Sequence, residues 1–144
     1  MPATYTFDIL STLDGYGSYS GGDWGGYWGK QGSELLDHRL ALYGAEQRMV
    51  FGANTYREFV QMLGSSTGEA DGIDPWVDRM RSLPATVVST SLRDPLAWSN
   101  ATVERGDAVD VVARLKRESG VPLRSAVGQA TALACGGRVP LLQE

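Results

Sequence analysis

Short strand-like segments alternate with helix-like segments along this chain, and this alternation restricts the possible folds more than any other sequence feature. Apolar and polar side chains alternate over residues 3–9, which is the period of a strand with one packed face. Apolar or β-branched runs predict further strands at residues 48–52, 85–92, 102–104 and 121–127. Helical spacing predicts helices within residues 33–44, 53–63, 75–80 and 107–119. We therefore predict an α/β fold, with a mostly parallel central sheet flanked by helices.

Capping residues predict where three of these helices begin. Ser33, Asp74 and Asp107 each carry a side-chain oxygen that can accept a hydrogen bond from the first turn of a helix. The first helix is expected to bury three side chains on one face: Leu36, Leu40 and Tyr43.

Size and charge exclude several classes of protein. The 144 residues allow one domain, spanning residues 1–144. A net charge of −4 provides no strong attraction to nucleic acid, and no run approaches the roughly 18 apolar residues of a membrane span. The single histidine, His38, and the single cysteine, Cys135, do not suggest a metal site or a disulfide. With no export signal apparent, we expect a cytoplasmic protein that binds no metal, nucleic acid or membrane.

A first polar site is expected where the strand at 48–52 runs into a helix. Gly52 lets a ligand approach the backbone closely, and the start of the helix offers free N–H groups suited to phosphate. Asn54 and Thr55 add polar side chains. The same residues also fit an ordinary turn followed by a helix cap.

Two more polar sites follow other predicted strands. Residues 89–91 place three hydroxyl groups together, which could hold phosphate or ribose or simply make turn hydrogen bonds. Arg93 lies just beyond them and could pair with a phosphate. Asp14 follows the first strand, either to orient a substrate or as a turn residue. Because ligands of open α/β sheets bind at the carboxyl ends of the strands, these sites are expected to lie at one edge.

The aromatic residues of the long loop at 15–32 allow two interpretations. Tyr and Trp side chains there could stack on a flat heteroaromatic ligand or could cover the protein's own core.

Several motifs occur in the order seen in one known family. Ser-Thr-Leu-Asp-Gly at residues 11–15 resembles the S-x-D-G turn after the first strand of the RibD C-terminal, dihydrofolate-reductase-like family. Gly-Asp-Trp at 22–24, the junction at 51–56 and Leu-Pro through Leu at 83–92 resemble further motifs of that family. The resemblance covers roughly residues 3–124.

The resemblance implies a dihydrofolate-reductase-like fold and NADPH-dependent hydride transfer to a pterin-like, pyrimidine-like or other heterocyclic small molecule. It places Asp14 beside the nicotinamide and substrate as the catalytic residue. It places a first group of residues against cofactor phosphate: Gly52, Asn54 and Thr55. It places a second group near the adenosine ribose and its 2′-phosphate: Ser89, Thr90, Ser91 and Leu92. Arg93 is a candidate for binding the 2′-phosphate.

Two departures from the family pattern have consequences. Ala53 stands where the pattern has arginine, so a cationic phosphate ligand is missing. The sequence from about residue 125 does not resemble the family, so we expect the C-terminal strands to be missing, through truncation or a shifted reading frame. The resulting sheet edge predicts a homodimer. One alternative function is therefore a catalytically silent nucleotide-binding or oligomeric protein of the same fold, and another is a flavin- or pterin-binding module that uses the aromatic loop.

Overall fold

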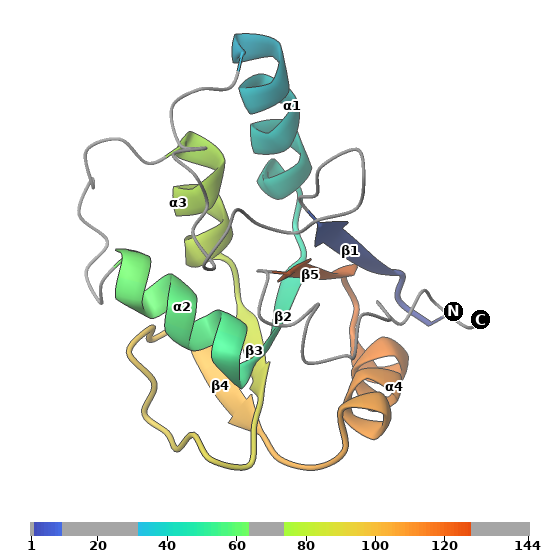
Figure 1. Ribbon diagram of the computed structural model, residues 1–144. Coiled ribbons are helices and arrows are strands. Elements are labelled where there is room, and N and C mark those ends of the chain that lie inside the picture. The colour runs from blue at the N-terminus through green and yellow to red at the C-terminus, as the bar shows by residue number, and fades with distance from the viewer. Residues whose placement is uncertain (1, 10–31, 64–73, 128–144) are drawn as a thin grey trace, which may run out of the picture.

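The computed structural model describes residues 2–9, 32–63 and 74–127 of the chain. Their strands are β1 (Tyr5–Ile9), β2 (Arg48–Gly52), β3 (Ala85–Val88), β4 (Ala101–Glu104) and β5 (Leu123–Val127). Their helices are α1 (Ser33–Gly44), α2 (Ala53–Leu63), α3 (Pro75–Ser82) and α4 (Ala108–Glu118). The strands form a sheet of order β1-β5-β2-β3-β4 in which every pair is parallel (Figure 1). The predicted α/β fold with a parallel central sheet is confirmed.

Helices cover both faces of this sheet. Met49 and Phe51 of β2 belong to one apolar cluster, which includes side chains of α1, α2 and α3. Val50, between them in sequence, points to the opposite face and packs with Val111 and Leu115 of α4. The chain crosses the sheet from β1 to β4 and then returns to β5, and a right-handed crossover in the return direction places its helix on the opposite face. The architecture is therefore three-layered, with α4 alone on its side among the described helices.

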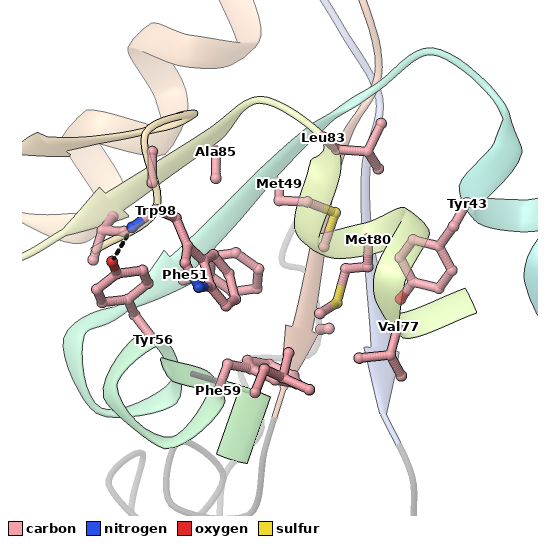
Figure 2. Packing of buried hydrophobic residues seen from close by; sticks show 14 of the residues in the cluster. Tyr43, Met49, Phe51, Tyr56, Phe59, Val77, Met80, Leu83, Ala85 and Trp98 are labelled. Carbon is pink, nitrogen blue, oxygen red and sulfur yellow. Dashed lines mark hydrogen bonds between the residues drawn. The ribbon is translucent and has the colours of Figure 1, made fainter. Parts of the chain in front are cut away.

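An aromatic cluster holds the chain segment after β3 against α2. The Phe51 ring lies 5.7 Å from the ring of Phe59 and 6.2 Å from that of Trp98, centroid to centroid. The backbone N–H of Trp98 donates a hydrogen bond of 3.2 Å to the hydroxyl of Tyr56, as Figure 2 shows. Because Trp98 is 4% exposed, the segment from β3 to β4 is anchored at its far end close to α2.

Two local predictions need correction. The strand predicted at 85–92 ends at Val88, because the hydroxyl of Ser89 bonds the backbone and turns the chain. Helix α1 begins with Ser33 as its first residue and Gly32 at the capping position, so Ser33 is not the cap. Its buried side chains are Arg39 and Tyr43, whereas Leu40 is 38% exposed.

Asp74 and Asp107 occupy the predicted capping positions of α3 and α4. The side chain of Asp107 accepts from the N–H groups of Val109 and Asp110, as predicted, whereas that of Asp74 makes no capping hydrogen bond. Over the residues that the structure describes, no helix combines the length and apolar character needed to cross a membrane.

Candidate functional site

Two of the polar sites expected from the sequence lie beside each other at the carboxyl edge of the sheet. Gly52 of β2 is paired in register with Val88 of β3. Each strand ends there, so the junction from β2 to α2 adjoins the turn that follows β3. This arrangement follows from the parallel pairing, because parallel strands present their carboxyl ends at one edge.

The junction between β2 and α2 exposes bare backbone. Gly52 is exposed, and a Cβ atom built on it would meet no heavy atom within 4 Å. Ala53 begins α2, whose first N–H groups have no partner within the helix. Asn54 is exposed, whereas Thr55 is 2% exposed, so the Thr55 hydroxyl lies inside the protein. Gly52 and Asn54 are therefore the members of this group that a ligand can reach directly.

The turn after β3 is organised by Ser89. Its hydroxyl oxygen accepts hydrogen bonds from the backbone N–H groups of Ser91 at 3.1 Å and Leu92 at 3.0 Å. Ser89 is buried and Leu92 packs against the large apolar cluster. Thr90 and Ser91 are exposed. The Ser89 hydroxyl therefore makes turn hydrogen bonds, whereas Thr90 and Ser91 are exposed and open to a ligand.

Arg105 bonds the carbonyl groups of the same turn. Its guanidinium donates to the carbonyl oxygen of Thr90 at 2.8 Å and to that of Leu92 at 3.0 Å. The exposed side chains of Thr90 and Ser91 thus belong to a turn whose backbone N–H and carbonyl groups are both hydrogen-bonded.

Arg57 joins the two polar sites, and sequence reasoning missed it. Its Nη2 donates to the Ser91 hydroxyl oxygen at 2.8 Å and its Nη1 to Asn54 Oδ1 at 3.2 Å. The available signal was its spacing, since it follows Ala53 by four residues and such residues share one face of a helix. Its contact with Ser91, 34 residues away, depends on the strand order and could not be read from the pattern.

A second charged cluster, also missed, lies between the end of β1 and α1. Arg39 Nη2 lies 2.8 Å from Asp8 Oδ2 and Arg39 Nη1 lies 3.3 Å from Asp8 Oδ1. The Tyr43 hydroxyl donates to Asp8 Oδ2 at 2.5 Å. The Arg39 guanidinium also sits 4.0 Å from the centroid of the Trp76 ring in α3. This cluster ties α1 to β1 and α3.

Burial shifts the ionisation of Tyr43. Desolvation is the main cause that raises the pKa of its phenol well above the ordinary value, and the charge and hydrogen bond of Asp8 raise it further. Tyr43 is therefore a neutral donor to an ionised carboxylate, which makes the bond charge-assisted.

Other residues named from the sequence are exposed or lie outside the described ranges. Asp14, the aromatic loop and Cys135 are outside them. His38 and Arg93 are exposed, and Arg93 makes no hydrogen bond to another described residue. Within the described parts of the chain, no three His, Cys, Asp or Glu side chains are grouped to hold a metal ion.

The comparison with solved structures supports the fold. A candidate riboflavin biosynthesis protein from Shewanella sp. PV-4 superposes with a TM-score of 0.55 and 23% sequence identity. The match covers 90% of this chain and 66% of the other, so this chain spans about two thirds of that protein's length. No family model and no curated protein sequence matches the chain. The shared α/β architecture agrees with a dihydrofolate-reductase-like fold.

Proposed function

We propose that this protein is an NADPH-dependent reductase of the RibD C-terminal, dihydrofolate-reductase-like family, which transfers hydride to a pterin-like, pyrimidine-like or other heterocyclic small molecule. The observation that carries the proposal is the adjacency of the Gly52 junction and the Ser91 turn at one sheet edge. The likeness to a protein named for riboflavin biosynthesis supports the family.

The donors at this edge suit the phosphates of a dinucleotide. Gly52 leaves the start of α2 open to an anion, and Asn54 lies beside it. Thr90 and Ser91 offer hydroxyls for the adenosine ribose and its 2′-phosphate. Three residues of the two groups support the site without facing the ligand. The Ser89 hydroxyl shapes the turn, and Leu92 and Thr55 pack into the protein. The net charge of −4 would oppose an anionic cofactor, and the guanidinium groups of Arg57 and Arg105 offset it at this edge.

Bound NADPH would supply the hydride, and the protein would orient the two rings and exclude water. Asp14 remains the proposed residue beside the nicotinamide and the substrate.

A matched pair of glycine variants tests the proposal. We expect NADPH to quench the tryptophan fluorescence of the wild-type protein saturably at micromolar concentration. In Gly52→Ala the added methyl group enters space that is empty in the protein, so thermal stability should not fall. It would occupy the path of the phosphate, so NADPH affinity should fall about tenfold or more.

Gly120→Ala is the control, because its Cβ also meets nothing within 4 Å and it lies between α4 and β5, at the opposite end of the strands. It should bind NADPH as the wild type does. A flat wild-type response to NADPH would refute the proposal, and a response to flavin or pterin alone would favour the binding module. If Gly52→Ala binds NADPH with the same affinity as the wild type, the cofactor phosphate does not bind at this junction.

One observation favours the alternative of a catalytically silent nucleotide-binding protein. Ala53 brings no cation to the first turn of α2. Incubating the protein with NADPH and a panel of oxidised pterins and pyrimidines separates the two functions. Loss of NADPH absorbance with any of them supports the reductase. Saturable binding without turnover supports the silent protein.

We also propose a homodimer. Among the described strands, β1 and β4 are outermost and each has a neighbour on one side only. Outer strands present unpaired N–H and C=O groups that another chain can bond. Light scattering on the full chain should give twice the monomer mass, and a monomer at all concentrations would overturn this.

A further inference from the structure

We propose that Arg57 is the residue that selects a 2′-phosphorylated nucleotide in this protein, by binding the phosphate together with Ser91. The inference rests on the proposed function and assigns the discrimination between NADPH and NADH to a side chain of α2.

Arg57 lies between the two polar sites. It contacts Asn54 in the first turn of its own helix and Ser91 in the turn after β3. Its guanidinium therefore lies between the two groups of residues expected to bind the cofactor. Helical side chains lean toward the N-terminus of their helix, so Arg57 brings its charge back toward the first turn, where Ala53 has none.

The charge of Arg57 is not neutralised by a carboxylate among the described residues. Arg39, Arg81 and Arg114 each form an ion pair with a carboxylate. Across residues 2–9, 32–63 and 74–127, Arg57 pairs with no carboxylate, and its two partners are a hydroxyl and an amide oxygen. A guanidinium carries five N–H donors, so Arg57 retains donors for a bidentate contact with a phosphate.

The turn after β3 places a hydroxyl group beside Arg57. The Ser91 hydroxyl lies 2.8 Å from Arg57 Nη2 and 3.3 Å from the Ser89 hydroxyl. Arg105 and Ser89 hold the backbone of this turn, so Ser91 is presented at a defined place next to a cation. A phosphate group beside Ser91 would accept from both side chains at once.

Arg93 is the competing assignment, since it follows the same turn in the sequence. It is exposed, and among the described residues it makes no hydrogen bond to Ser91 or Asn54, both of which bond Arg57. The geometry therefore favours Arg57 over Arg93.

Isothermal titration of the full chain with NADPH and with NADH tests the assignment. Arg57→Gln removes the charge and retains a polar side chain of similar length. We expect it to weaken NADPH binding about 10- to 100-fold while NADH binding changes by less than about threefold. Arg57→Lys should fall between, because it keeps the charge and loses the bidentate geometry.

Arg117→Gln is the matched control, since Arg117 is an exposed arginine in the last turn of α4, on the other face of the sheet. It should leave both affinities unchanged. Circular dichroism of every variant checks that the fold is retained, which is expected because Arg57 is exposed.

The outcomes separate this inference from the proposed function. If the wild type binds neither nucleotide, the proposed function fails and the inference fails with it. If the wild type prefers NADPH and Arg57→Gln keeps that preference, only the inference is overturned. It is also overturned if Arg93→Gln abolishes the preference, or if the wild type binds both nucleotides equally well.

Discussion

Neutralising Asp8 is expected to destabilise the protein strongly, because it leaves a buried cation without its partner. The side chains of Arg39 and Asp8 are 8% and 13% exposed and meet through two hydrogen bonds. Asp8→Asn keeps the shape of the side chain and removes its charge. Breaking a buried pair in this way costs about 3–5 kcal/mol of unfolding free energy. This range includes the free energy lost because the Tyr43 hydroxyl then donates to a neutral amide oxygen, which is a weaker acceptor than a carboxylate.

A double-mutant cycle tests whether the loss arises from the uncompensated charge. Arg39→Met removes the cation and leaves an apolar side chain over the Trp76 ring. Combined with Asp8→Asn, it leaves neither position of this pair with an uncompensated charge, so the double variant should lose at least about 2 kcal/mol less than the sum of the single losses.

Urea unfolding followed by far-ultraviolet circular dichroism gives the four free energies. Tyr43→Phe provides a milder check, with an expected loss of about 1.5–3 kcal/mol, since it removes one hydrogen bond to a charged acceptor. Additive losses, within about 0.5 kcal/mol, would refute the coupling. A loss below about 1 kcal/mol for Asp8→Asn would show that the ion pair is solvated.

Three further changes have definite expected results. The pKa of Tyr43 is raised in the folded state, so its contribution to stability is fully present below the ordinary phenol pKa of about 10. Above that pH the unfolding free energy falls by about 1.4 kcal/mol per pH unit. The urea midpoint of Tyr43→Phe should therefore decline less steeply at alkaline pH than that of the wild type, and an identical slope would contradict this. Asp107→Ala removes a side chain that accepts from the N–H groups of Val109 and Asp110, and should lower unfolding free energy by about 1 kcal/mol, whereas an unchanged urea midpoint would deny the cap a role. Gly106 has a φ of 126°, which suits glycine, so Gly106→Ala should lower the melting temperature with a loss of about 1–3 kcal/mol; a melting temperature equal to that of the wild type would rule out strain there.

The sequence predicted those parts of the fold that depend on neighbouring residues. The alternating pattern at 3–9 and the apolar run at 48–52 identified β1 and β2, and Asp107 identified the start of α4. Local hydrogen bonding also explains why the strand predicted at 85–92 is shorter in the structure. The β-branched run there favours a strand, but the Ser89 hydroxyl competes for the backbone N–H groups and ends β3 at Val88.

The order of elements in the chain, together with strand periodicity, determined that this is a layered α/β protein with polar residues after its strands. Only the tertiary structure decided which of those residues meet. Arg57 reaches Ser91 because β2 and β3 are neighbours in the sheet. Arg39 is buried because Asp8, 31 residues away, lies beneath α1. Periodicity reports which face of an element is covered, whereas pairing between distant charges depends on strand order and helix placement, which no local pattern encodes.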